Sequence, residues 1–419
     1  MTTAKVPTTK DGNRRSFWVS ALIPVIAMGL LLAFFVTGDP LAIFTSVFPP
    51  IEDLSFERIR VVPQGFEVAV INGSPEPVTI AQVLVDDAYW HFNIEPSAEI
   101  GRLATANITI PYPWVEGEPH DIRLITSTGA TFDGVVEIAV PTPSPGVRQF
   151  LSYGMVGVYV GIIPVGLGLL WYPAMRRLER KWLGLILALT VGLLVFLLID
   201  TFVEALEFAG ALPSAFQGIT IVLFSALLTW FLLIAVRSNM RAGKKVSSAS
   251  SGLSLATLIA FGIGLHNLGE GLAIGTAFAL GEVALGSFLV VGFTLHNVTE
   301  GVGIAAPLLP RLRSDPATDE ENTSAGNKPK FSTFLGLALL AGAPAILGTW
   351  IGGFISSPLL TVLFLGIGVG AIWQVIAEVS GLLRTYAENE STPLASWPNM
   401  IGFTLGFLIM YLTAFLVSV

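Results

Sequence analysis

Two copies of one short polar pattern interrupt the apolar sequence of this 419-residue chain. They read Gly262-x-x-Leu265-His266-Asn267-x-x-Glu270-Gly271 and Gly292-x-x-Leu295-His296-Asn297-x-x-Glu300-Gly301. In each copy the His and the Glu are four residues apart, which places them about 40° apart around a helix, so both project from one face. Two such helices would supply two imidazoles and two carboxylates. That ligand set suits Zn²⁺ and also admits Fe²⁺, Mn²⁺, Co²⁺ or Cd²⁺.

An asparagine, Asn267 or Asn297, follows the His of each copy. Its carbonyl oxygen would add a ligand, or its amide would orient the ligands beside it. Mg²⁺ and Ca²⁺ fit this set poorly because they prefer oxygen ligands. The alternative is a packing network in which His, Asn and Glu hydrogen-bond across helices without metal. The repetition of the pattern at matched depth in two apolar runs favours metal.

The composition indicates a polytopic α-helical membrane protein. Hydrophobic residues make up 53% of the chain, charged residues only 12%, and the mean hydropathy is +0.73, which is too apolar for a soluble protein of this length. Cysteine is absent, which excludes disulfides and thiolate ligands, and no basic face suited to nucleic acid accompanies the net charge of −8. Nine stretches approach or exceed the ~20 residues that span a bilayer: 17–37, 150–172, 182–208, 214–236, 253–279, 284–309, 331–355, 358–384 and 398–419.

The positive charges predict the orientation. Five of the 22 Lys and Arg residues lie in or beside one large insert, and the other 17 fall on a single side if the N-terminus is cytoplasmic. The prediction is therefore a multi-pass protein of the cell membrane, in contact with membrane lipid, with a cytoplasmic N-terminus at 1–16 and an outside C-terminus. The run 17–37 is interpreted as an uncleaved transmembrane anchor. An export signal is the alternative, since Arg14-Arg15 precede it.

Residues 50–145 differ from the rest of the chain and predict an exported, soluble β-sandwich of immunoglobulin-like or cupredoxin-like shape. Short alternating stretches, separated by turn residues, predict strands at 65–72, 77–85, 88–94, 104–110, 120–126 and 131–140. His91 and His120 are its only histidines, and a blue-copper site would need a Cys that the chain lacks. They are interpreted as structural or surface residues. A role in binding a partner is expected, although the sequence does not identify that partner.

Other charged and polar residues within the spans extend the His/Glu pattern into a path. Asp200, Glu204 and Glu207 form one stripe of a helix towards its outer end, and Gln374 and Glu378 are one turn apart near a cytoplasmic mouth. A cation would enter past the first group, bind near the midplane and leave past the second. The alternative for the first group, above all for Glu207, is an interfacial position without a role in transport.

The segments His266-Asn-Leu-Gly-Glu-Gly and His296-Asn-Val-Thr-Glu-Gly resemble the signature of the fourth and fifth helices of the ZIP family of divalent metal transporters. Residues 150–419 would correspond to the eight-helix core of that family. The resemblance implies that His266, Glu270, His296 and Glu300 bind the transported ion, with Asn267 and Asn297 beside them. It also implies a homodimer and uptake of a divalent metal ion, most simply zinc, towards the cytoplasm.

Three departures from the family pattern limit this resemblance. Gly269 and Thr299 stand where many members have Pro before the motif Glu, and Ala343 stands where many have a carboxylate that helps bind a second metal. The cytoplasmic loops contain no His. A site for a single ion is therefore expected. The rival interpretations are a metal sensor that does not transport and an intramembrane zinc hydrolase; the chain lacks His-Glu-x-x-His, so no enzymatic activity is expected.

Overall fold

The computed structural model describes residues 22–31, 33–34, 51–142, 144, 146–242, 248–280, 283–309, 329–355 and 357–418. The chain divides into two compact units, residues 1–50 and 51–419. In the first unit the described residues form a short apolar helix, Leu22–Leu31. The ends of the predicted anchor at 17–37 and the cytoplasmic segment 1–16 lie outside the described residues.

The N-terminal part of the second unit is an antiparallel β region built from two sheets. Its strands are β1 (Leu54–Val62), β2 (Gly65–Asn72), β3 (Val78–Val85), β4 (Ala88–Trp90), β5 (Asn93–Glu95), β6 (Glu99–Ile100), β7 (Thr105–Pro111), β8 (His120–Thr126) and β9 (Thr131–Val136). One sheet has the order β1-β2-β7-β5 and the other β4-β3-β8-β9, with β6 paired to β3. Alternate residues of both sheets, such as Val68, Ile108, Val83 and Leu124, are buried in one apolar core. β2, β3, β7 and β8 correspond to predicted strands. The strand predicted at 88–94 is instead divided between β4 and β5, which lie in different sheets, and the one predicted at 131–140 ends at Val136. β1 and β6 were not predicted.

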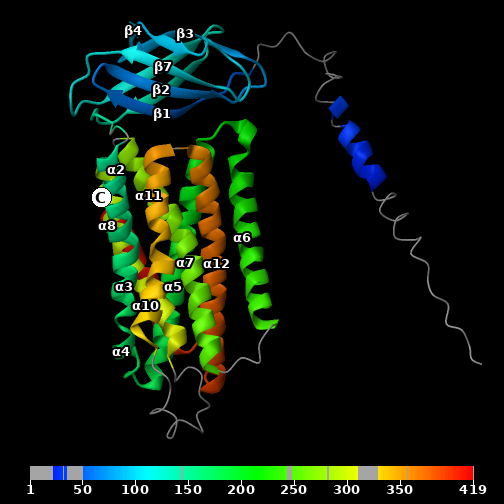
Figure 1. The fold of residues 1–419 in the computed structure, drawn as a ribbon, viewed down its shortest axis with the longest axis vertical. Coiled ribbons are helices and arrows are strands. Elements are labelled where there is room, and N and C mark those ends of the chain that lie inside the picture. The colour runs from blue at the N-terminus through cyan, green and yellow to red at the C-terminus, as the bar shows by residue number, and fades with distance from the viewer. Residues whose placement is uncertain are drawn as a thin grey trace, which may run out of the picture. The chain divides into compact units, whose positions relative to one another are not determined.

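The rest of the second unit is helical. Its helices are α2 (Val147–Gly157), the π-helical η2 (Val158–Ile162), α3 (Ile163–Leu169), α4 (Tyr172–Met175), α5 (Arg180–Gly210), η3 (Ser214–Phe216), α6 (Gly218–Ala242), α7 (Ser248–Ala279), α8 (Val283–Ala305), η4 (Ala306–Leu308), α10 (Phe331–Gly342), α11 (Pro344–Ile355), α12 (Pro358–Asn389) and α13 (Trp397–Ser418). They run side by side as a bundle (Figure 1). By length and composition, eight helical segments in the described part of the chain are able to cross a membrane, as predicted for 150–419.

The long helices pack in two groups. The site-bearing group contains α2, η2, α3, α7, α8, α10 and α11, and within it α7 packs most extensively on α11 and α8 on α3. The flanking group contains α5, α6, α12 and α13, in which α5 packs on α13 and α12 on both α5 and α6. The main contact between the groups is that of α7 with α12.

Glycine permits the closest helix contact inside the site-bearing group. A Cβ atom at Gly271 would lie 2.2 Å from the carbonyl oxygen of Ala345, and one at Gly348 would lie 2.1 Å from that of Leu268. Only a residue without a side chain allows backbones to approach this closely. The contact fixes α7 against α11 beside the second half of the His-Asn-Glu pattern.

Two spans of the site-bearing group are interrupted halfway along their length. The first changes from α to π geometry at Val158–Ile162 and resumes as α3, in which Pro164 is the second residue. The other ends as α10 at Gly342 and resumes as α11 at Pro344. Proline has no N–H, so the carbonyl four residues before it loses its normal helical donor. Both interruptions therefore expose backbone carbonyl oxygens inside the bundle.

Candidate metal centre

The two polar patterns lie on neighbouring helices. His266, Asn267 and Glu270 are on α7, and their counterparts His296, Asn297 and Glu300 are on α8, which contacts α7 directly. All six side chains are buried. The helical period places the His and Glu of each copy on one face, and the α7–α8 contact turns these faces together. The structure thus brings together all six residues of the predicted ligand set.

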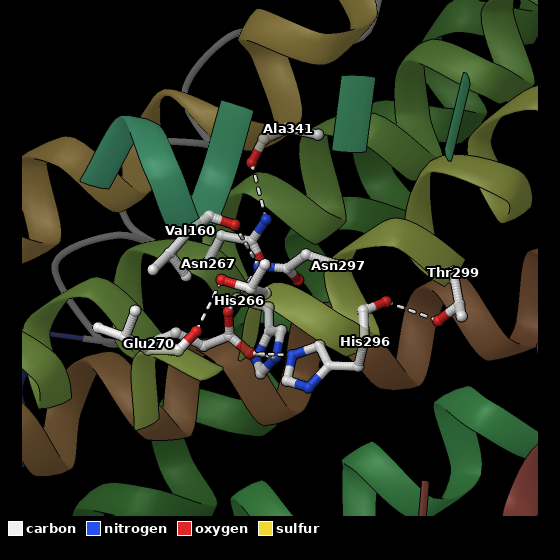
Figure 2. Close-up of polar contacts among 10 residues, drawn as sticks. Val160, His266, Asn267, Glu270, His296, Asn297, Thr299 and Ala341 are labelled. Atoms are coloured by element: carbon white, nitrogen blue, oxygen red, sulfur yellow. Dashed lines mark hydrogen bonds and ion pairs between the residues drawn. The ribbon is translucent and has the colours of Figure 1, made fainter. Parts of the chain in front are cut away.

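Glu270 lies between the two imidazoles. Its Oε1 atom is 2.5 Å from Nε2 of His296 and 3.0 Å from Nε2 of His266 (Figure 2). Its Oε2 atom accepts a hydrogen bond of 3.2 Å from Nδ2 of Asn297. The ring centroids of the two histidines are 6.4 Å apart. One carboxylate therefore links both His side chains, which face each other across the α7–α8 contact.

Glu300 completes the cluster from α8. One ligand atom each of His266, His296 and Glu300 lies within 4.8 Å of the others, a spacing that allows one ion to contact all three. Among the residues that the structure describes, neither carboxylate oxygen of Glu300 accepts a hydrogen bond of ordinary geometry. Buried acceptors in folded proteins nearly always have a donor or a cation. We refer to His266, Glu270, His296 and Glu300 as the His/Glu site.

The two asparagines tie the His/Glu site to the interrupted spans. Asn297 donates through Nδ2 to the carbonyl of Val160 at 3.1 Å, and Asn267 donates through Nδ2 to that of Ala341 at 3.1 Å (Figure 2). Val160 lies four residues before Pro164, so its carbonyl has no normal helical donor and the amide of Asn297 replaces it. In the described part of the chain, the Oδ1 atom of each asparagine is buried without a donor. These oxygens add acceptors beside the four ligands.

A small cavity adjoins the His/Glu site where the two helix groups meet. It has about 10 Å³ of space, close to the minimum for a single water molecule, and Glu300, His296 and Thr299 of α8 form one wall. Residues of α5 and α13, including Thr190 and Met410, form the other wall. The contact between the groups is therefore incomplete next to the candidate ligands.

The acidic side chains predicted to line an entry path lie on α5. Asp200 and Glu207 are exposed and Glu204 is half-buried. Asp200 interacts electrostatically with His266 and His296, and Glu204 with His266 and Glu270. The structure thus places Asp200 and Glu204 near the His/Glu site.

The other two predicted path residues lie at the opposite end of the bundle. The end of α5 packs against the beginning of α12 through Ala205, Ala209 and Val362, so the two helices are antiparallel. Gln374 and Glu378 are in the second half of α12, and both are buried. The predicted path residues therefore lie on both sides of the His/Glu site, and the structure does not bring Gln374 and Glu378 into it.

No protein-family model matches the chain, and no curated protein matches it.

Sequence reasoning missed three features around these residues. The carbonyls of Val160 and Ala341 accept hydrogen bonds from the asparagines. Pro164, four residues after Val160, signals the first of these free carbonyls, whereas Pro344 frees the carbonyl of Leu340 and marks only an interruption near Ala341. Arg237 of α6 forms an ion pair with Glu378 of α12. No local pattern signals that pair, because the partners are on different helices far apart in the chain.

Proposed function

We propose that the protein transports divalent metal cations, zinc or a chemically similar ion, across a membrane. The observation that carries this proposal is the convergence of two imidazoles and two carboxylates at a buried place between helices that are long and apolar enough to span. Ionisable groups at such depth are costly and normally mark a pathway. Among the described residues, neither oxygen of Glu300 accepts a hydrogen bond of ordinary geometry, which favours a cation over a closed hydrogen-bond network.

The arrangement of the helices supports movement of the bound ion. The four ligands belong to the site-bearing group, whereas Asp200, Glu204, Gln374 and Glu378 belong to the flanking group. A rigid shift of one group against the other would expose the His/Glu site first to Asp200 and Glu204 of α5 and then to Gln374 and Glu378 of α12. The small cavity at Thr299 and Glu300 lies at the surface that would slide.

The proposed direction is uptake towards the cytoplasm. The positive-inside rule places the end of α5 outside and the end of α12 inside, so uptake would run from the acids of α5 to Glu378. The likeness of the two patterns to the ZIP signature supports the same direction, as well as a homodimer in the cell membrane. Ala343, at the interruption between α10 and α11, brings no carboxylate to the site, which supports one bound ion rather than two.

Metal uptake into proteoliposomes tests the proposal. The full chain, reconstituted and supplied with Zn²⁺, Fe²⁺, Mn²⁺ or Cd²⁺, is expected to show saturable flux that is lost in the double variant His266→Ala/His296→Ala. His91→Ala is the matched control, because it removes an exposed histidine of the β region and should leave the flux unchanged. Stoichiometric metal binding without flux would replace transport by a sensor role. Turnover of a lipid or peptide substrate would instead indicate a hydrolase.

A further inference from the structure

A charged cluster outside the His/Glu site joins the flanking helices α6 and α12. Arg237 of α6 pairs through its guanidinium with Oε1 of Glu378, and Nε2 of Gln374 donates to the same oxygen at 2.7 Å. The two helices are neighbours in the bundle (Figure 1). Arg237 thus supplies positive charge to a carboxylate that the proposed exit path uses.

Glu378 lies along the line on which α12 faces the site-bearing helix α7. A Cβ atom at Gly368 would lie 3.3 Å from Nδ1 of His266, and one at Gly262 would lie 2.7 Å from the side chain of Val375. Gly368, Val375 and Glu378 are spaced at i, i+7 and i+10, so they share one face of α12. Glu378 is about 15 Å beyond the point of contact with His266, at 1.5 Å per residue. Within this face it is the next carboxylate that an ion leaving His266 along α12 would reach.

The two partners of the ion pair differ in burial. The Glu378 side chain is 1% exposed, whereas that of Arg237 is 31% exposed. A long Arg side chain near a helix end is able to move its head group to the interface, and a buried Glu is not. Arg237 is therefore the partner that is able to leave. Once the guanidinium has moved, the carboxylate of Glu378 and the amide oxygen of Gln374 are also ligands that a divalent cation is able to bind.

We propose that Glu378 and Gln374 form a second, transient site for the transported divalent cation, and that Arg237 is the tethered cation that occupies it between transport events. This inference rests on the proposed transport function. The guanidinium neutralises Glu378 while the ion is bound at the His/Glu site, and swings aside when the ion arrives. Its return then displaces the ion, because two cations compete for one carboxylate. Arg237 thereby prevents Glu378 from trapping the cargo.

The number of metal ions bound per chain tests this proposal. Purified full-length protein is titrated with Zn²⁺ and Cd²⁺ as wild type, Arg237→Gln, and Arg237→Gln/Glu378→Gln. Wild type is expected to bind one ion, Arg237→Gln one further ion, and the double variant one again. Arg384→Gln is the matched control, since it removes an arginine of α12 whose ion pair with Glu388 is exposed. An unchanged stoichiometry in folded Arg237→Gln overturns the second site.

A second variant keeps the proposal testable if Arg237→Gln does not fold. Glu378→Gln removes the buried carboxylate with which Arg237 pairs, and the Arg237 side chain already reaches the surface. It is expected to bind one ion at the His/Glu site with wild-type affinity and to lose most of the uptake into proteoliposomes. Wild-type uptake by this variant overturns the proposal. Absence of any bound metal in the wild-type protein would instead overturn the proposed function itself.

Discussion

The β region and the helical bundle each contain a buried histidine beside a carboxylate, and the two arrangements differ in how their acceptors are used. In the β region, Oδ2 of Asp86 accepts hydrogen bonds of 2.8 Å from Nδ1 of His120 and from the hydroxyl of Tyr112. Its Oδ1 accepts a third, of 3.0 Å, from the backbone N–H of Asp121. Both oxygens of this carboxylate are therefore satisfied by protein donors.

In the bundle, Glu270 is similarly surrounded by donors but Glu300 is not. Both oxygens of Glu300 and the Oδ1 atoms of Asn267 and Asn297 lack ordinary donors among the described residues. The matching unpaired atom in the β region is Nε2 of His120, whose ring packs against Phe66 and Tyr112. A His–carboxylate pair alone thus indicates little about metal. Several unpaired oxygens that converge on two imidazoles are what favours a cation.

The largest effect is expected when the charges of the His/Glu site are removed. The double variant Glu270→Gln/Glu300→Gln is expected to lose metal binding, because neutral amides replace both anionic ligands while side-chain volume is preserved. Isothermal titration with Zn²⁺ of the purified full-length protein measures the loss. The variant should remain folded, because an amide is easier to bury than an unpaired charge.

Asp86→Asn in the β region is the matched control for that experiment. It also converts a carboxylate beside a histidine into an amide, and it should bind metal as the wild type does. Equal metal binding by the wild type and Glu270→Gln/Glu300→Gln would show that the unpaired oxygens of Glu300 do not indicate a metal ligand.

A smaller effect is expected from the asparagine that ties the His/Glu site to the π-helical segment. Asn297→Ala removes the donor to both Val160 and Glu270. Loss of a residue that orients a ligand typically weakens metal affinity by about 10–100-fold, so we expect a change in that range. Competition with a fluorescent chelator measures it.

Asn399→Ala is the matched control for the asparagine. Asn399 is also buried and donates through Nδ2 to a backbone carbonyl, that of Leu394, at 2.9 Å, but it is on α13 and outside the His/Glu site. It is expected to lower the thermal stability without changing metal affinity. A similar loss of affinity in both variants would attribute the effect of Asn297→Ala to general loosening of the bundle.

The sequence predicted those parts of the structure that depend on local periodicity. Residues four apart share a helix face, so His266 with Glu270 and His296 with Glu300 follow directly from spacing. Alternation likewise predicted β2 and β8. It failed for β1, because the register shifts between Phe56 and Arg58 and the regular alternation is lost there.

Contacts between distant helices were beyond such reasoning. Arg237 belongs to a cluster of positive charges at the end of a span, which predicts only the side of the membrane. Its pairing with Glu378 depends on the packing of α6 against α12, which no local pattern encodes. The carbonyl of Val160 was unpredicted for a related reason: Pro164 signals an interruption, but not which side chain will satisfy the carbonyl that it frees.

The smallest effect is expected for the Asp86–His120 pair of the β region, in which both carboxylate oxygens accept hydrogen bonds. Partial burial raises the pKa of Asp86. Hydrogen bonds from His120, the Asp121 amide and Tyr112 outweigh that effect and hold the pKa of Asp86 below its ordinary value. A lowered pKa in the folded state stabilises the fold above the unfolded pKa of about 3.9, and the contribution disappears as pH falls through the folded value. Because the Asp86 side chain is 39% exposed, Asp86→Asn should cost no more than about 1 kcal/mol at pH 7. Hydrogen exchange of the segment 120–126 in the full chain should therefore be faster in Asp86→Asn than in wild type at neutral pH, and the difference should shrink towards pH 3. A difference independent of pH would mean that shape, and not charge, holds this pair together.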